Sequence, residues 1–460
     1  MTRSPASPRQ RWYHGVSRYQ WLVLIIASAG WVFDVYEGQI FVANMNEAMA
    51  ALLPDGTGKG TMQSWNNYAL AAFLVGGAVG GVFFGWLSDR IGRAKTLAYT
   101  ILMYSVFTCL TAFATDAWQL LALRFVVAIG VGGEWAVASA MVAEVFPDRL
   151  RAQMGSIFHS SSVLGTWLAT LVTYLLTTHP DSWLMAPLLD QFGGTKWRAA
   201  FVLGALPAFL VVAVRLWLKE PPKWQESVAK SGAGAGAGEA GGSRLAGLFK
   251  GEALRSTLVG VSLATVGLAT FWGVHVFGKD FTQAAAAAQG LAGEAVKSAE
   301  LRGMFLTTTG GGLGLFFFGP ICAWLGRIRT FAAFHIGGFL TGFLMFRFGF
   351  DWFAQNPASL WFALPVFGFF TLGMHAGYAI YFPELYPTRL RGTGAGFCFN
   401  AARLFAAPIL ILTGFLTTSA AEGGMGLTRP ETAAYLSCLY LAGLVVLRFA
   451  PETRDRALPK

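Results

Sequence analysis

The feature that most constrains the fold is a repeated apolar window long enough to cross a lipid bilayer. Twelve such windows of about twenty residues recur along the 460-residue chain. Within a bilayer, only helices and closed barrels satisfy their own backbone hydrogen bonds, and windows of this length match helices. The sequence therefore predicts an all-α membrane protein with twelve transmembrane helices. The windows lie near residues 19–43, 66–88, 95–114, 118–142, 154–177, 199–218, 256–278, 302–325, 330–349, 359–383, 393–417 and 432–450.

Composition argues against the alternative that these windows are buried helices of a soluble protein. Hydrophobic residues make up 55% of the chain and charged residues 13%, whereas soluble domains carry about a quarter charged residues. A polar stretch precedes the first window, so we expect no cleaved signal peptide. The cysteines lie in apolar segments at unrelated spacings, which predicts neither a disulfide framework nor a metal site. They are Cys109, Cys322, Cys398 and Cys438.

The basic residues indicate the orientation in the membrane. If the odd-numbered windows leave the N-terminal side, segments on that side hold 23 of the 34 Lys and Arg residues, and the opposite loops hold five. Because positively charged loops stay in the cytoplasm, we expect a multi-pass protein of the plasma (inner) membrane with both termini cytoplasmic. Topology then explains the net charge of +10. The basic residues form no patch, so we expect no nucleic-acid partner.

A flexible segment divides the chain between the sixth and seventh windows. It contains "SGAGAGAGEAGG", a Gly/Ala-rich sequence typical of linkers. We therefore expect a six-helix bundle over residues 1–220, a cytoplasmic linker over 221–255 and a second six-helix bundle over 256–460.

The two halves share an internal repeat. "EVFPDRLRAQMG", after the fourth window, matches "ELYPTRLRGTGAG", after the tenth, at Glu, Pro, Arg, Leu and Arg. "GWLSDRIGRAKTL" and "GPICAWLGRIRTF" form a weaker pair in which Gly92 matches Gly326 and Arg93 matches Arg327. Two matches in corresponding loops predict a duplicated six-helix unit, an architecture of secondary transporters whose substrate site lies between the repeats.

These motifs resemble the major facilitator superfamily. "GWLSDRIGRAKTL" is similar to its loop signature between spans two and three, and "RFVVAIGVGGEWAVASAMVAEVFPDRLRAQMGSIF" and "PELYPTRLRGTGAGF" resemble its sugar porters and metabolite:proton symporters. "FDVYEGQIF" is most similar to sialic acid, lactate and aromatic acid symporters. "KEPPKW" departs from the sugar-porter motif, which disfavours a true sugar porter. The resemblance implies two pseudo-symmetric six-helix bundles that work by alternating access.

The resemblance also implies a cytoplasmic gate built from the repeated loop motifs. The alternative is positive-inside charge with surface ion pairs worth under about 1 kcal/mol. Asp89 can accept hydrogen bonds from the start of the third helix, where the helix dipole favours an anion. The expected gate residues are Gly85, Asp89, Arg90, Gly92, Arg93, Glu144, Arg149, Arg151, Arg327, Glu384, Arg389 and Arg391.

Two acids lie inside the first window. Asp34 is roughly 22 Å from its cytoplasmic start and Arg124, on the fourth window, about 9 Å from the outer surface; in a core about 30 Å thick these depths nearly coincide. Glu37 follows Asp34 by three residues and shares its helix face. We expect Arg124 to offset the burial cost of these acids and Asp34 to exchange the coupled proton. The alternative is a static ion pair that orders helix packing.

Other polar residues of the windows are candidates for the same cavity. Glu134 in "GVGGEW" pairs with charges or carries protons, and Arg403, near Asn400, binds an anionic partner or pairs with a backbone carbonyl or with an acid. His275 and His375 lie on expected cavity helices and can relay protons near neutral pH. The alternative for each histidine is a hydrogen-bonded packing role.

Intramembrane arginines together with titratable acids favour one function. We expect a secondary active transporter that moves a small organic anion, a carboxylate or sugar acid, with protons or Na⁺. The alternatives are a sugar or polyol carrier of the same fold and, because the C-terminal tail is short, less favourably a nutrient sensor. We expect no enzyme activity and no cofactor, since no catalytic constellation or nucleotide-binding loop is present. The expected partners are the substrate, the coupling ion and the lipid bilayer, and the expected state is a monomer.

Overall fold

The computed structural model describes residues 15–220, 245–387 and 390–454, and the described residues with regular structure are helical. The N-terminal half contains α1 (Arg18–Leu52), α2 (Lys59–Ile91), α3 (Arg93–Thr111), α4 (Ala117–Val145), α5 (Asp148–Ser160), α6 (Ser162–Thr178), α7 (Ala186–Gln191), α8 (Lys196–Leu203) and α9 (Ala208–Trp217). The C-terminal half contains α12 (Gly251–Thr270), a π-helical turn (Phe271–His275), α13 (Phe277–Ala288), α14 (Glu294–Leu325), α15 (Arg327–Phe348), α16 (Phe350–Gln355), a 3₁₀ turn (Pro357–Ser359), α17 (Leu360–Gly373), α18 (His375–Glu384), α19 (Arg391–Thr417), a 3₁₀ turn (Ala420–Glu422), α20 (Arg429–Ser437) and α21 (Leu439–Leu447).

Each of the twelve apolar windows coincides with a helix or with consecutive helices. Within the described residues, ten helical stretches are long and apolar enough to cross a membrane. The windows at 95–114 and 154–177 are not among them. The first is α3, which contains several polar residues, and the second is divided between α5 and α6 at Ser161. The threonines of α3 and Ser105 lower its hydropathy, and they are buried against the rest of the protein rather than exposed to lipid.

Local signals explain where some of the long helices begin. Ser17 and Gln20 form a reciprocal capping box at the start of α1. Asp116 caps α4 by accepting a hydrogen bond from the backbone N–H of Gln119 at 2.9 Å. Thr428 and Glu431 form a second capping box at the start of α20.

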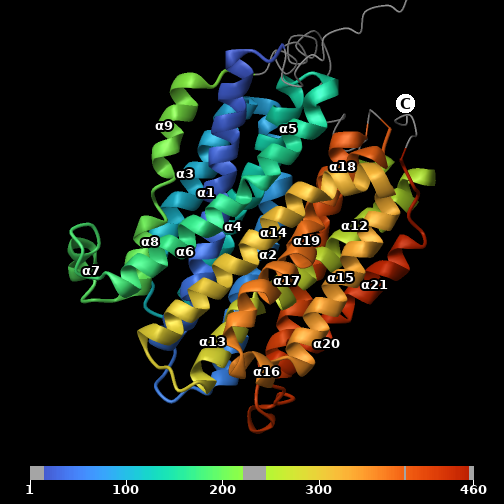
Figure 1. Ribbon diagram of the computed structural model, residues 1–460. Coiled ribbons are helices and arrows are strands. Elements are labelled where there is room, and N and C mark those ends of the chain that lie inside the picture. Colours follow the sequence, from blue (N-terminus) through green and yellow to red (C-terminus); the bar gives the residue numbers. More distant parts are fainter. Residues whose placement is uncertain (1–14, 221–244, 388–389, 455–460) are drawn as a thin grey trace, which may run out of the picture.

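The helices form two bundles with the long helices running between two ends of the molecule (Figure 1). We call the end that carries the start of α1 and the end of α21 the termini end, and the opposite end the far end. The bundles pack through α2 against α19 and through α6 against α14. The Gly/Ala-rich segment lies largely outside the described residues, and α12 begins at Gly251, within the 221–255 range expected for the linker.

Candidate functional site: a cavity between the two halves

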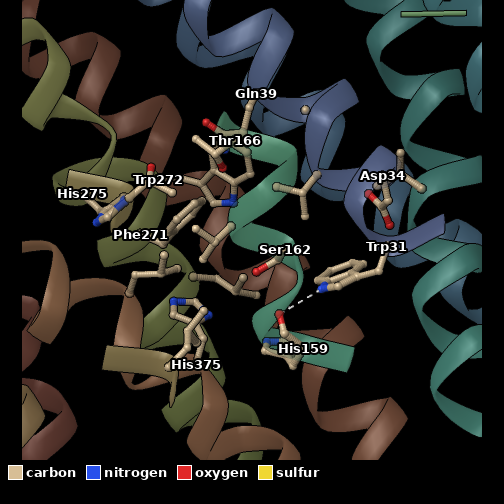
Figure 2. A pocket seen from close by; sticks show the side chains of 18 of the residues that line it. Trp31, Asp34, Gln39, His159, Ser162, Thr166, Phe271, Trp272, His275 and His375 are labelled. Atoms are coloured by element: carbon tan, nitrogen blue, oxygen red, sulfur yellow. Dashed lines mark hydrogen bonds between the residues drawn. The ribbon is translucent and has the colours of Figure 1, made fainter. Parts of the chain in front are cut away.

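A cavity of about 140 Å³ lies between the two halves of the protein. The N-terminal half supplies lining residues from α1, α2, α4, α5 and α6, and the C-terminal half supplies them from α12, the π-helical turn, α14 and α17–α19. Figure 2 shows aromatic rings and histidines from both halves around the same space. The polar and aromatic residues of the lining are Trp31, Asp34, Gln39, Phe73, His159, Ser162, Thr166, Phe271, Trp272, His275, Thr308, His375, Phe399 and Arg403.

The π-helical turn Phe271–His275 shapes one wall of the cavity. It interrupts the path from α12 to α13, and its wider spacing brings Phe271, Trp272 and His275 all to the cavity surface. Such turns occur mostly as single insertions at functional sites. The ring of His275 stacks on Phe271 with centroids 5.1 Å apart, so this wall is aromatic and rigid.

Asp34 and Arg403 carry opposite charges in the cavity lining. They interact electrostatically, yet they form no ion pair within 4.0 Å among the described side chains. Asp34 is 3% exposed and Arg403 7%. Neither Oδ2 of Asp34 nor Nε of Arg403 has a hydrogen-bond partner within the described residues. The two groups can therefore each bind something that enters the cavity.

Arg124 is occupied by Glu37 rather than by Asp34. Its guanidinium donates to both carboxylate oxygens of Glu37, with Nη2 3.2 Å from Oε2. The Thr108 hydroxyl donates to the same carboxylate at 2.9 Å. Both partners are fully buried, and the guanidinium lies over the rings of Phe41 and Phe73. This geometry matches the static-pair alternative for Glu37 and leaves Asp34 without its expected counter-ion, because Asp34 lies one turn nearer the termini end.

Glu134 is a third buried acid close to Asp34. Its carboxylate faces Gly30 of α1, where a methyl group would collide with Oε1. The Tyr104 hydroxyl lies beside Glu134 without a hydrogen bond of good geometry, and neither carboxylate oxygen has a partner among the described residues. Because an ionised, unpartnered carboxylate is costly in this environment, Glu134 is a site where a proton can reside.

Both predicted histidines reach the cavity, and so does a third. The Nδ1 atom of His275 is 2.7 Å from Oγ1 of Thr371, whereas Nε2 of His375 has no hydrogen-bond partner within the described part of the chain. His159 of α5 stacks on Trp31 with ring centroids 5.6 Å apart. The indole N–H of Trp31 donates to the backbone carbonyl of His159 at 3.3 Å (Figure 2).

Asn400 lies outside the lining, against Gly81 of α2, where a methyl group would collide with its amide. Sequence reasoning missed Trp31, Gln39, His159, Ser162 and Thr166 as lining residues. Trp31 and Gln39 lie on the helix that carries Asp34, three residues before it and five after it. The other three lie on α5 and α6, from which the sequence analysis named no cavity residue. Their polar character within an apolar window was the available signal.

The repeated loop motifs form matching clusters at the termini end. Nη2 of Arg93 is 3.1 Å from Oε1 of Glu144 in the N-terminal half. In the C-terminal half, Arg327 binds Glu384 through two hydrogen bonds of 3.0 and 2.7 Å. These ion pairs each join helices of one half, so they brace the bundles individually.

A second acid completes each cluster, and sequence reasoning did not find it. Glu220 accepts hydrogen bonds from the backbone N–H groups of Ala94 and Lys95 at the start of α3. Glu452 accepts equivalent bonds from Arg327 and Ile328 at the start of α15, both at 3.0 Å. Both acids lie next to a proline just beyond the last helix of their half, and that shared position was the signal.

Glycines make room for these acids. Gly92 and Gly326 have φ of 108° and 91°, a conformation that favours glycine. A methyl group at either would meet the carboxylate of Glu220 or Glu452. Each loop thus positions the start of a helix around an anion, where the helix dipole stabilises it.

The remaining expected gate residues are only partly described. Arg90 is exposed and lies over the ring of Trp86, and Gly85 has open space around it. The side chains of Asp89, Arg149, Arg151, Arg389 and Arg391 lie outside the described part of the structure. Among the described residues, no group of three or more His, Cys, Asp or Glu side chains could hold a metal ion.

Comparison with known proteins agrees with the fold. The chain matches the family described as "Sugar (and other) transporter" over residues 22–240. It is 28% identical to the cis,cis-muconate transport protein of Acinetobacter baylyi, over 81% of this chain and 83% of that protein. It is 26% identical to the sialic acid transporter NanX of Escherichia coli, over 87% and 88% of the two chains.

Solved structures show the same architecture. The xylose transporter XylE from E. coli, in a partially occluded inward-open conformation, superposes with a TM-score of 0.71 at 17% identity, covering 96% of this chain and all of that one. At this identity the likeness shows the fold alone. The duplicated helical bundles, the loop motifs and the transporter relatives agree: over most of its length, this chain is similar to transporters of the major facilitator superfamily.

Proposed function

We propose that this protein moves a small organic anion, a carboxylate or sugar acid, together with protons by alternating access. The observation that carries the proposal is Arg403, a buried cation that lines the central cavity without an ion-pair partner within 4.0 Å among the described side chains. A buried charge is costly unless it is paired, so a carboxylate of the substrate completes this site.

The cavity lining favours the rest of such a substrate. Trp31, Phe271, Trp272 and Phe399 offer flat apolar surfaces, and His375 offers a free ring nitrogen. Relatives named for cis,cis-muconate, niacin, gentisate and sialic acid act on carboxylic acids, which supports an organic acid here.

Asp34 supplies the site for proton coupling. Arg403 favours the ionised form of Asp34, and burial favours the protonated form. A substrate carboxylate that takes up the charge of Arg403 weakens the first effect and leaves the second. Substrate and proton then bind together, which is the behaviour of a symporter.

The charge distribution supports one orientation. We place the termini end in the cytoplasm of a cell with the protein in its plasma (inner) membrane, because the loops at that end carry most of the basic residues. The far end then faces outwards. The clusters around Glu144 and Glu384 lie on the cytoplasmic side, where we propose that they help to gate the cavity as the two halves move about the linker. The working unit is a monomer.

The experiment is transport by purified protein in proteoliposomes. Radiolabelled cis,cis-muconate, nicotinate, gentisate and N-acetylneuraminate are offered under an inward proton gradient, an inward Na⁺ gradient or neither, with D-xylose as the neutral control. We expect at least one acid to accumulate against its gradient only when the proton gradient is imposed. Accumulation of xylose alone would favour the alternative, a sugar carrier of the same fold. Binding without transport would favour a sensor.

A further inference from the structure

A network of charged side chains, four of them buried, lies at the far end of the protein. Lys279 Nζ is 2.8 Å from Glu300 and 3.2 Å from Asp280, and Arg429 reaches Asp280 at 3.3 Å. Lys297 Nζ is 3.0 Å from Glu47 and 3.4 Å from Glu300. We call these six residues the far-end network. They are Glu47, Lys279, Asp280, Lys297, Glu300 and Arg429.

Lys297 joins the network to the other half of the protein. Its ammonium on α14 donates to the carbonyl of Ala43 on α1 at 2.5 Å and pairs with Glu47 on the same helix. Lys279, Asp280 and Glu300 are 5% exposed or less. Because the ion pair with Glu47 and the hydrogen bond to Ala43 both join α14 to α1, the network favours a closed far end.

The charges of the far-end network balance only while the halves touch. The C-terminal half contributes three cations and two acids, and the N-terminal half contributes Glu47. Separation of α1 from α14 removes Glu47 and leaves the C-terminal part of the network with one excess positive charge. That charge lies on Lys297, whose remaining acid, Glu300, is shared with Lys279.

A second, smaller cavity lies between this network and the central cavity. This cavity of about 20 Å³ is lined by Lys279 together with Gln39, His275 and Thr308. The last three residues also line the central cavity. An anion that enters at the far end by this side therefore meets Lys279, which shares Glu300 with Lys297, before it reaches Arg403.

We propose that Lys297 is an exchange site at the outer entrance, where the carboxylate of an incoming substrate replaces Glu47. When the far end opens and Glu47 separates from Lys297, the substrate anion compensates the charge of Lys297. The anion then leaves Lys297 and moves on to the central cavity. Glu47 pairs with Lys297 again as the far end closes. This role rests on the proposed function, because it needs an anionic substrate and the far end outside. It makes Lys297 and Glu47 a substrate-capture pair as well as a latch.

Two matched substitutions separate the latch from the capture role. Both Glu47→Gln and Lys297→Gln remove the ion pair, so both should open the far end. Only Lys297→Gln removes the cation that the substrate uses. We expect Lys297→Gln to raise the external KM about tenfold or more, the size of one lost charge-assisted contact. Glu47→Gln should lower the KM or leave it unchanged, because the competing carboxylate is gone.

Opening is measured separately, with no substrate present. Ser64 of α2 is buried at the far end, with its hydroxyl 2.6 Å from that of Thr418, the residue that follows α19. A Ser64→Cys background is labelled with a membrane-impermeant maleimide in intact cells and, in parallel, in inside-out vesicles. Both Gln variants should label faster than the background, in cells only. Labelling confined to vesicles would overturn the outward placement of the far end.

Uptake is then measured in the same cells with external nicotinate and cis,cis-muconate. Lys196→Gln is the matched control. It also removes an ion pair between the two halves at the far end, because Lys196 lies 3.0 Å from Glu294. That pair is exposed to solvent, so its loss should have little effect. It should change neither labelling nor KM. Lys297→Arg keeps the positive charge and should keep the KM near the wild-type value. This variant also provides a test of the capture role if Lys297→Gln fails to fold.

The outcomes distinguish the proposals. Faster labelling with an unchanged KM in Lys297→Gln would overturn the capture role and leave a latch. Unchanged labelling in both Gln variants would overturn the latch, and with it the exchange. If wild-type protein takes up neither acid nor any other of the acids tested above, the proposed function fails, while the labelling arm still reports on the latch.

Discussion

Arg124 of α4 holds both carboxylate oxygens of Glu37 of α1 in a region without solvent access. Phe41 and Phe73 flank the guanidinium, and Thr108 donates to the carboxylate. With its charge matched and its oxygens bonded, Glu37 is bound into the packing of α1 against α4. The neighbouring Asp34 faces the cavity instead.

We predict that Glu37→Gln destabilises the protein by about 3–5 kcal/mol, the usual cost of leaving one partner of a buried pair uncompensated. The measurement is thermal unfolding of the purified protein in detergent. The double variant Glu37→Gln/Arg124→Met, which removes both charges, should recover much of the lost stability. A wild-type melting temperature for Glu37→Gln would show that the pair does not stabilise the fold.

Asp34→Asn should abolish uphill accumulation driven by an inward proton gradient and keep counterflow exchange of the same substrate. Asparagine resembles the protonated acid, so it allows binding but cannot take up or release a proton. Both assays use the same proteoliposomes with an imposed pH gradient, and exchange serves as the internal control for folding. If the variant still concentrates substrate, the coupled proton resides elsewhere, and Glu134→Gln becomes the decisive variant.

Glu452 gives a prediction for stability and pH. Burial raises the pKa of its carboxyl, but hydrogen bonds from the backbone N–H groups of Arg454, Arg327, Ile328 and Thr453 lower it by more, so the net shift is downwards. The stabilisation is therefore fully present above the unfolded pKa of about 4.3 and is lost as the pH falls through the folded pKa.

Glu452→Gln should thus lower the melting temperature at pH 7.5, with a difference from wild type that shrinks below about pH 4. Glu220→Gln is the matched variant in the other half, since Glu220 makes the equivalent bonds at the start of α3, and it should also lower the melting temperature at pH 7.5. A Glu452→Gln difference that is constant with pH would exclude the carboxylate's charge as its cause.

The fold could be predicted from the sequence because membrane helices are recognisable by their length and hydropathy. The repeated motifs predicted the duplication. For Arg93 and Glu144, and for Arg327 and Glu384, the sequence predicted only that the residues lie at neighbouring helix ends. The ion pairs themselves are seen in the structure. We expected Arg124 to be the counter-ion of Asp34, whereas the structure pairs it with Glu37. Depth along a helix is known to a few ångströms, and one helical turn decides the pair.

The sequence also could not reveal contacts that depend on tertiary packing. His159 reaches the cavity from α5, and the six charges of the far-end network come from α1, α13, α14 and α20, which include segments far apart along the chain. The π-helical turn at Phe271–His275 has no distinct apolar period, yet it determines which side chains of this segment face the cavity. Such features follow from how the helices are placed, which local patterns do not encode.

Arg403→Lys should impair uptake although it conserves the charge. A guanidinium offers a planar pair of donors that binds a carboxylate bidentately, and an ammonium does not. Losing one charge-assisted hydrogen bond of about 1.5–3 kcal/mol raises the KM by roughly tenfold or more. Initial rates of acid uptake in proteoliposomes measure the effect, and the melting temperature of the variant checks that it folds.

A second variant tests the same site without touching the charge. Gly77 of α2 lies against the guanidinium, and a methyl group there would collide with Nη1 of Arg403. Gly77→Ala should therefore displace the guanidinium of Arg403 and raise the KM, as Arg403→Lys should. Gly396→Ala, in open space on the helix that carries Arg403, is the control for adding a methyl group and should leave the KM unchanged. Wild-type uptake by both Arg403→Lys and Gly77→Ala would remove Arg403 as the anchor of the substrate, and the search for that anchor would move to the free ring nitrogen of His375.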